Sequence, residues 1–241
     1  MHASASAVAR IIGDSYNHHV SQHPPTDFWG QVKRHVFGRP IADAQIRLIV
    51  GAIEEALAFR PDDVLLDLAC GNGALSQEFY ELCSGCLGID VSEELIRVAN
   101  RYFAAPPDYD FQPRDVAAYV QEEARPERFT KVLCYGSFSY FHPDSARLVL
   151  ETLARRFTNV ERVFIGNLPD LDRLHAFYPG RSATDPGVTD PLAELGIWRT
   201  AEEFTALADS TGWSARLTVM PPDFYAAHYR YDALLTRQAS G

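Results

Sequence analysis

Residues 63–76 constrain the fold more than any other part of the chain. Residues 64–68 form a nearly unbroken apolar run, which is typical of a parallel strand covered on both faces. The run carries the acidic residue Asp67 near its end, and Gly71 and Gly73 follow it. Glycines at such positions let the backbone come close to a ligand without obstruction by side chains. The segment therefore predicts a buried strand, a turn that holds a nucleotide-containing ligand, and a helix.

A second segment, residues 86–96, repeats the pattern of an apolar strand, a terminal acid and a capped helix. Its acid, Asp90, follows the glycine turn by roughly 20 residues, the spacing at which a doubly wound fold presents a carboxylate to ribose hydroxyls. Ser92 is a favourable residue for starting the next helix. A strand-end Asp can also simply cap a turn, but two such acids in register favour ligand binding.

The position of Asp67 argues against a dinucleotide ligand. A loop of the NAD type holds a pyrophosphate at a helix N-terminus, and a strand-end carboxylate would repel it. Ser76 also replaces the third glycine of that loop. The stretch instead resembles the first motif of class I S-adenosylmethionine-dependent methyltransferases. In that family the acid serves a cationic cofactor, and the Gly-x-Gly turn passes under its amino-acid part and ribose.

Two later segments are similar to further elements of the same family. Residues 111–116 resemble the element whose acid accepts a hydrogen bond from the adenine amino group, and residues 129–143 resemble the fourth strand and the segment beside the methyl group. The resemblance implies S-adenosyl-L-methionine as the cofactor and S-adenosyl-L-homocysteine as its product. The implied cofactor-binding residues are Asp67, Ala69, Gly71, Gly73, Asp90, Val91, Asp115, Val116, Cys134 and Tyr135.

Length and composition agree with a globular α/β unit. The 241 residues allow one domain, or one domain with an extension, and 46% hydrophobic residues suffice for a full core. A formal net charge of −10 argues against nucleic-acid or anionic-membrane partners, which need basic patches. No run approaches the roughly 18 apolar residues of a membrane span. Because the chain's start also lacks signal-peptide features, we expect a cytoplasmic location, as a monomer or homodimer.

The order of patterns predicts a doubly wound α/β fold. Residues 61–166 alternate strand and helix, giving five parallel strands, and two more strands near 213–220 and 229–236 would complete a seven-stranded, mostly parallel sheet with an antiparallel last strand. Residues 1–60 predict a helical cap, or lid, over the cofactor cleft, ahead of a methyltransferase domain at 61–241. A proline- and glycine-rich loop near 178–199 is long for a connection, so we expect it to contact substrate.

The loop between the last two strands gives a site argument based on topology. A parallel sixth strand ends at the edge where ligands bind, and an antiparallel seventh strand begins there. The loop is dense in groups that exchange protons, among them His228, which we expect to be the catalytic base. The alternative is that His228 caps the loop while Tyr229 packs the hairpin.

His142 competes with His228 for the role of base, because it follows the fourth strand near the expected methyl group. It can equally be the residue that starts the helix before Pro143. A metal site of His18, His142 and His228 is an alternative that sequence spacing cannot test. We expect no metal, and the Cys83-Cys86 pair has no second Cys or His pair at ligand spacing. The expected substrate-binding residues are Tyr16, His18, Trp29, Tyr140, Tyr225 and Tyr229.

The whole chain resembles a bacterial class I methyltransferase of the kind found in natural-product and cell-surface pathways. This implies methyl transfer to an oxygen or nitrogen of a small-molecule acceptor, in which the enzyme positions the reactants and removes a proton. An aminopropyl transferase would share the cofactor geometry, but paired acids that could hold a polyamine are not apparent after the fourth strand. The strand-end acids also fit a non-catalytic cofactor-binding subunit and, less well, a nicotinamide enzyme.

Overall fold

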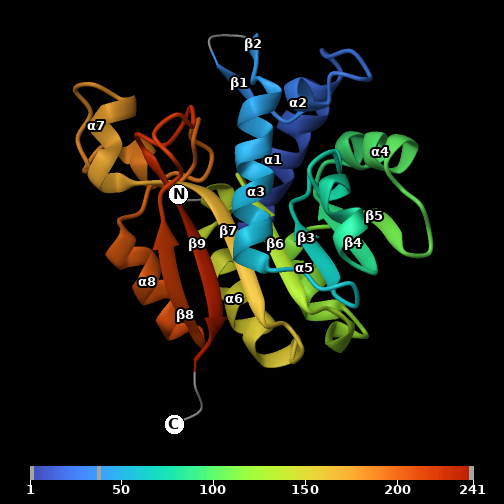
Figure 1. Ribbon diagram of the computed structural model, residues 1–241. Helices are drawn as coiled ribbons and strands as arrows, with labels where there is room; N and C mark the ends of the chain where they lie inside the picture. The colour runs from blue at the N-terminus through green and yellow to red at the C-terminus, as the bar shows by residue number, and fades with distance from the viewer. Residues whose placement is uncertain (1–2, 37–38, 239–241) are drawn as a thin grey trace.

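The computed structural model describes residues 3–36 and 39–238 of the chain. A seven-stranded sheet forms its centre, in the order β5-β4-β3-β6-β7-β9-β8 (Figure 1). The sheet strands are β3 (Val64–Leu68), β4 (Gly85–Asp90), β5 (Tyr109–Pro113), β6 (Lys131–Tyr135), β7 (Arg162–Pro169), β8 (Trp213–Thr218) and β9 (Arg230–Arg237). Neighbouring strands from β5 to β7 pair in parallel, while β9 pairs antiparallel with both β7 and β8. The predicted doubly wound sheet with an antiparallel last strand is confirmed.

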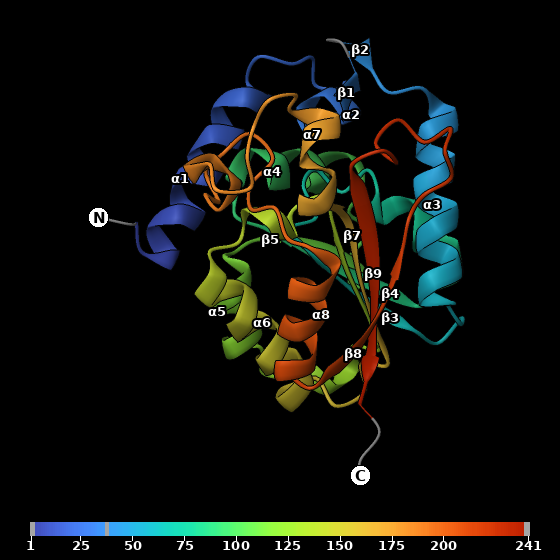
Figure 2. The same ribbon diagram turned by 90° about the vertical axis from the view of Figure 1, so that its left-hand side faces the viewer.

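Helices cover both faces of this sheet. On one face, α5 (Val116–Glu122), α6 (Pro143–Arg156) and α8 (Ala201–Ser210) pack their apolar side chains against the strands. The other face is covered by α3 (Asp43–Leu57), by the 3-10 helix η1 (Ser76–Leu82) and by α4 (Glu93–Tyr102). Figure 2 shows α5, α6 and α8 on the opposite side of the sheet from α3. Both faces are therefore buried, as the apolar strands require.

The remaining elements are short and lie around this layered centre. Two strands of two residues each, β1 (His35–Val36) and β2 (Arg39–Pro40), pair antiparallel. The other short elements are α2 (Phe28–Gln31), α7 (Leu174–Phe177), η2 (Pro126–Arg128), η3 (Phe138–Tyr140), η4 (Leu171–Arg173) and η5 (Pro186–Val188).

The order of the strands locates a ligand site. β3 lies between β4 and β6, and the chain builds outward from β3 to β5 before it returns to the other side of β3 with β6. Open α/β sheets bind ligands at the carboxyl ends of the strands where the order reverses in this way. That place is the carboxyl ends of β3, β4 and β6.

The N-terminal residues divide between this edge and the sheet. α1 (Ala5–Val20) packs on α4, and its Asn17 side chain accepts hydrogen bonds from Ser92 Oγ at 2.8 Å and from the amide of Glu94 at 3.1 Å. The helix therefore helps to satisfy the free amides at the start of α4. By contrast, α3 buries Ile49 and Ile53 in the apolar layer against the sheet. The region expected to form the cap thus contains one helix that belongs to the sheet layer.

The element after the glycine turn differs from the expected helix. Residues Ser76–Leu82 form a 3-10 helix whose first turn has no side-chain cap. Ser76, its first residue, donates its hydroxyl to Asp67. Short 3-10 turns of this kind commonly serve as connectors.

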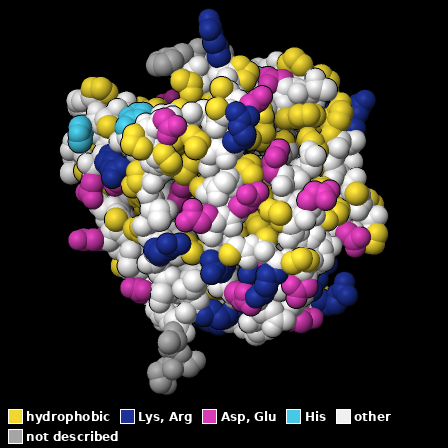
Figure 3. All heavy atoms as spheres, viewed as in Figure 1, with side chains coloured by type: hydrophobic (Ala, Val, Ile, Leu, Met, Phe, Trp, Pro, Cys, Tyr) yellow, Lys and Arg dark blue, Asp and Glu magenta, His cyan; other side chains and the backbone are white. Residues whose placement is uncertain are grey.

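Two features of the surface bear on possible partners. Within residues 3–36 and 39–238, no helix has both the length and the apolar composition needed to span a membrane. On the face shown in Figure 3, acidic and basic side chains are interspersed.

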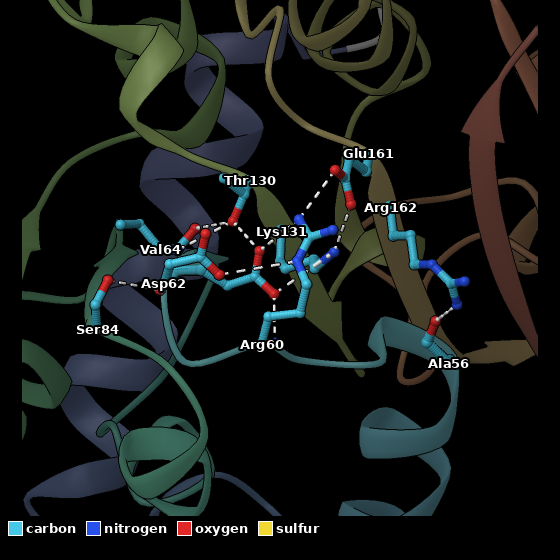
Figure 4. A network of polar contacts seen from close by, with 10 residues as sticks. Ala56, Arg60, Asp62, Val64, Ser84, Thr130, Lys131, Glu161 and Arg162 are labelled. Atoms are coloured by element: carbon cyan, nitrogen blue, oxygen red, sulfur yellow. Dashed lines mark hydrogen bonds and ion pairs between the residues drawn. The ribbon is translucent and has the colours of Figure 1, made fainter.

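A polar network holds the opposite, amino-terminal edge of the sheet (Figure 4). The Lys131 side chain is 2% exposed, and its ammonium lies 3.6 Å from Asp63 and donates to Glu161 at 2.9 Å. Asp63 also accepts from the Thr130 hydroxyl at 2.7 Å and from the Arg60 amide at 2.7 Å. The network joins β3, β6 and the start of β7 far from the ligand edge, which indicates a structural role.

We predict that Lys131→Met lowers the free energy of unfolding by about 3 kcal/mol, because it leaves the buried Asp63 carboxylate without its ammonium partner. Urea unfolding measures this change. Arg60→Met is the comparison: its guanidinium donates to the same Asp63 at 3.2 Å, but the Arg60 side chain is 51% exposed, and exposed ion pairs contribute at most about 1 kcal/mol. Equal losses in the two variants would contradict the structural role of Lys131.

Candidate cofactor and acceptor site

A cavity of about 360 Å³ opens at the carboxyl edge of the sheet, where the strand order reverses. The ends of β3, β4 and β6 form its floor, and α1 forms one wall. The segments after β7, the loop before α8 and the start of β9 complete its lining. Its size is that of an ordinary small-molecule site.

Asp67 lies at the floor of this cavity and is 2% exposed. Its carboxyl accepts a hydrogen bond of 2.6 Å from Ser76 Oγ. Burial raises the pKa of Asp67 to about 7, although the Ser76 bond and the nearby Arg34 charge act in the opposite direction. A positively charged ligand group would favour the ionised form, so Asp67 is suited to meet a cation.

Asp90 joins the glycine turn to the neighbouring strand. Its Oδ2 accepts from the amide of Gly71 at 2.9 Å, and its Oδ1 accepts from the amide of Ser92 at 2.8 Å. Burial raises the pKa of Asp90, and these backbone bonds oppose that rise. Each carboxylate oxygen can accept a further hydrogen bond, so Asp90 can still bind a pair of ligand hydroxyls.

The turn itself needs the left-handed backbone region at Ala69, with φ of 58°, at Gly71, with 61°, and at Gly73, with 78°. Ala69 and Gly71 line the cavity, but Gly73 lies beneath the turn. A Cβ at Gly73 would come within 2.7 Å of the Phe111 ring, so this glycine is needed for packing. The expectation that Gly73 faces the ligand is not supported by this position.

The other residues expected to bind the cofactor also separate into those that line the cavity and one that does not. Those that line it are Val91, Asp115, Val116 and Tyr135. Asp115 also caps α5, because its side chain accepts from the amide of Ala118 at 2.9 Å. Cys134 is instead buried in the apolar layer beneath the cavity, because alternate residues of a strand face opposite sides of the sheet.

The residues expected to bind the substrate differ in whether their side chains face the cavity. Tyr16 on α1 and Tyr140, Tyr225 and Tyr229 all line the cavity. His18, two residues after Tyr16, is exposed and makes a hydrogen bond of 2.9 Å to Gln22.

Trp29, the sixth residue of this group, supports the cavity without lining it. Its ring lies beneath the Arg34 guanidinium, with 5.3 Å between the guanidinium carbon and the ring centre. Arg34 itself lines the cavity.

Only one of the two histidines expected to act as base is at the cavity. His142 lines it and caps α6, where its Nδ1 accepts from the amide of Asp144 at 3.2 Å. His228 is exposed and packs edge-on against Tyr229, with ring centres 4.8 Å apart. It is not among the cavity-lining residues, because Tyr229 takes the inward position in the loop.

A metal site of His18, His142 and His228 is not formed, since these residues lie in separate places. Among the residues that the structure describes, the one group with ligand atoms close enough for a metal is His23, Asp27 and His35. His23 Nδ1 and Asp27 Oδ2 lie 2.9 Å apart there.

Sequence reasoning missed several polar residues of the cavity, among them Arg34, Asn167 and Arg230. Asn167 lies near the end of β7, Arg230 directly follows Tyr229, and Arg34 belongs to the N-terminal region expected to form the cap. Their residue types were visible, but a sequence pattern carries no signal for which of them would meet in one cavity.

Residues 65–159 match the sequence model of a family described as a methyltransferase domain. An uncharacterized methyltransferase of Schizosaccharomyces pombe is 28% identical over 113 residues, which are 43% of this chain and 38% of that protein. A ubiquinone biosynthesis O-methyltransferase of Leptothrix cholodnii is 29% identical over 85 residues, 35% of this chain and 36% of its own length. The match therefore spans little more than a third of either relative.

A solved structure extends the likeness to the whole fold. It is the 1,6-didemethyltoxoflavin-N1-methyltransferase of Burkholderia thailandensis, with 1,6-didemethyltoxoflavin and S-adenosylhomocysteine bound. It superposes with a TM-score of 0.63 at 18% identity, covering 100% of this chain and 92% of the other. The chain thus shares the Rossmann-like fold of that structure, and its residues 65–159 match a methyltransferase domain, in agreement with the resemblance seen in the sequence.

The raised pKa of Asp67 predicts how stability changes with pH in the absence of ligand. From about pH 4 to pH 7 the folded chain retains a proton on Asp67 that the unfolded chain releases, so rising pH lowers the free energy of unfolding. Relative to Asp67→Asn, which cannot ionise, the natural protein should lose about 2–3 kcal/mol between roughly pH 5 and pH 8. Urea unfolding at both pH values measures the difference, and a constant difference would contradict the raised pKa.

Proposed function

We propose that the protein is an S-adenosylmethionine-dependent methyltransferase that transfers the methyl group to an oxygen or nitrogen of a small-molecule acceptor. One observation carries the proposal: Asp67 and Asp90 stand at the ends of adjacent parallel strands, on either side of a glycine turn, and line one cavity. A pair of carboxylates suits a ligand with an ammonium group, a sulfonium and a ribose, and it disfavours a pyrophosphate.

The cavity residues offer a partner for each part of this cofactor. Asp90 accepts hydrogen bonds from the ribose hydroxyls, while Asp115 and Val116 bind the adenine. Asp67 and the nearby Arg34 form a pair of opposite charges, which matches the ammonium and carboxylate of the amino-acid part. Arg34 Nη1 is buried with no hydrogen-bond partner among the described residues, which supports a ligand role for this guanidinium.

The bound sulfonium supplies a methyl group that is already activated for in-line attack. The residues of the chain then have to hold the acceptor in line, exclude water and accept a proton where the nucleophile carries one. Tyr16 and Tyr140 line the cavity, and burial raises the pKa of both phenols, so they stay protonated near neutral pH. Neither phenol is therefore a base. The Tyr140 hydroxyl already donates to the carbonyl of Glu194 at 2.8 Å, so Tyr16 is the hydrogen-bond donor to the reactants.

The proton acceptor that we propose is His142 instead of His228, because only His142 lines the cavity. The role requires the tautomer with the proton on Nδ1, directed toward the Asp144 carboxylate, whose Oδ2 lies 3.6 Å away. Nε2 is then free to take the proton of the acceptor. This tautomer exchanges the helix-capping bond of His142 for a contact with Asp144.

The names of the relatives support a role in small-molecule biosynthesis. One is named for O-methylation in ubiquinone biosynthesis, and another for N-methylation of a didemethyltoxoflavin. Both names describe methyl transfer, and they differ in the atom that is methylated. We therefore leave oxygen and nitrogen as equal possibilities for this protein.

Calorimetric titration with S-adenosylhomocysteine tests the proposed cofactor. We expect the natural protein to bind it, and Asp90→Ala to bind roughly tenfold to a hundredfold more weakly, because charge-assisted hydrogen bonds to the ribose are lost. Asp110→Ala on the neighbouring strand β5 is the matched control and should bind normally. Binding of NADH in place of S-adenosylhomocysteine would overturn the proposal.

Turnover in two histidine variants tests the proton acceptor, measured as S-adenosylhomocysteine formed with an acceptor found by an activity screen. His142→Ala should lose roughly two to four orders of magnitude, the usual range for a positioned base. His228→Ala should stay within about twofold, since its exposed ring is a control of the same type. If both variants remain active, the nucleophile needs no side-chain base; if only His228→Ala fails, the role returns to His228.

A further inference from the structure

Unpartnered polar atoms gather in the cavity. Five buried side-chain atoms have no hydrogen-bond partner among the described residues, and four of them belong to residues that line this cavity. The four are Arg34 Nη1, Tyr135 Oη, Asn167 Oδ1 and Arg230 Nε. Buried polar atoms are nearly always paired in folded proteins, so this concentration points to groups that a ligand satisfies.

Arg230 is the most informative of these residues. It begins β9 and is 9% exposed, and its guanidinium stacks on the Tyr229 ring with 4.9 Å between the guanidinium carbon and the ring centre. Nη1 donates to the carbonyl of Asn167, but Nε has no partner. Within the described residues, no carboxylate lies within 4.0 Å of its nitrogens.

Asp232, two residues along β9, does not neutralise Arg230 by direct contact. Its carboxylate instead accepts from the amide of Asn167 at 2.6 Å. Burial raises the pKa of Asp232 to about 6, and the Arg230 charge offsets only part of that rise. A buried cation without a contacting anion is costly, which favours a ligand that supplies the anion.

The surroundings of Arg230 add hydrogen-bond donors. Tyr135 is 6% exposed, and its hydroxyl has no partner among the described residues. Burial raises the pKa of Tyr135 well above its usual value, and the charges of Arg34 and Arg230 only partly oppose this, so the phenol keeps its proton. Burial likewise raises the pKa of Tyr225, with both arginines again opposing it.

The acids of the cavity are engaged elsewhere. Asp67, Asp90 and Asp115 belong to the part assigned to the cofactor, and Arg34 is assigned to the amino-acid carboxylate beside Asp67. Glu194 is exposed and accepts from the Tyr178 hydroxyl at 2.7 Å. Apart from the acceptor Asn167 Oδ1, the unpartnered groups around Arg230 are donors or carry positive charge.

We propose that the methyl acceptor carries an anionic group, a carboxylate or a phosphonate, which binds to the Arg230 Nε and the Tyr135 hydroxyl. The inference rests on the proposed function, because it concerns the acceptor half of the same cavity. The anion anchors the acceptor and is not the atom that is methylated. An arginine held against the nucleophile would stabilise the anionic ground state more than the transition state, in which that charge is lost.

Three probes of nearly the same shape test the anion: benzoate, phenylphosphonate and neutral benzamide. Each is titrated by calorimetry into the protein saturated with S-adenosylhomocysteine. We expect at least one of the two anions to bind roughly tenfold or more tightly than benzamide, as a hydrogen bond to a charged group implies. The anion that binds tighter identifies the class of acceptor. If benzamide binds as well as both anions, or if neither anion binds, the proposal is wrong.

Four arginine variants assign the effect to a residue. Arg230→Gln should remove the preference for the anion and leave the affinity for S-adenosylhomocysteine within about twofold, while Arg230→Lys should retain part of the preference. Arg34→Gln should do the reverse: it should weaken S-adenosylhomocysteine roughly tenfold. The same variant should leave methylthioadenosine, which lacks the amino-acid carboxylate, unchanged. Arg216→Gln, on the exposed side of β8, is the control for a lost surface charge.

The two proposals can fail separately. If S-adenosylhomocysteine does not bind to the natural protein, the proposed function fails. If it binds, but Arg230→Gln and the natural protein select equally between benzoate and benzamide, only the anion site fails. Should Arg230→Gln not fold, Arg230→Lys and the benzoate-to-benzamide ratio of the natural protein still decide the question.

Discussion

The hydrogen bond from the Gly71 amide to the Asp90 carboxylate joins the two strand ends on which the rest of the site depends. It ties the glycine turn after β3 to the end of β4, and it leaves both carboxylate oxygens at the floor of the cavity. The N-terminal region also holds the turn, because Asn72 donates to the carbonyl of Phe28 at 2.8 Å and to the side chain of Gln31 at 2.9 Å. One short segment thus fixes the sheet edge, the cofactor site and part of the N-terminal cover.

Most of the fold was predictable because the apolar runs are local signals with one dominant solution. Buried parallel strands that alternate with helices stack in a doubly wound order, and the two final strands complete the sheet antiparallel. The packing of α3 against the sheet was not predictable in this way. Its apolar stripe, including Ile49 and Ile53, shows that one face is buried, but not whether the sheet or the cleft buries it.

The site residues likewise separate into those that the local sequence pattern places and those that only tertiary packing places. Asp67 and Asp90 could be placed together because the carboxyl ends of parallel strands meet at one edge. His228 could not be placed, because it lies in a loop where adjacent side chains point in different directions. Tyr229 lines the cavity, while His228 beside it faces solvent. Arg230 was visible in the same stretch, but its significance comes from an unpartnered nitrogen that only the packing shows.

The overall charge of the chain is compatible with an anionic acceptor. A net charge of −10 repels anions at long range, yet salt screens exposed charges over about 8 Å under physiological conditions. Arg230 is 9% exposed, so its field is weakened far less by solvent and acts at short range within the cavity. Under the two proposals, the acids at the floor attract the cationic cofactor, and the buried guanidinium attracts the acceptor's anion. Each proposed ligand is then held by the opposite sign of charge.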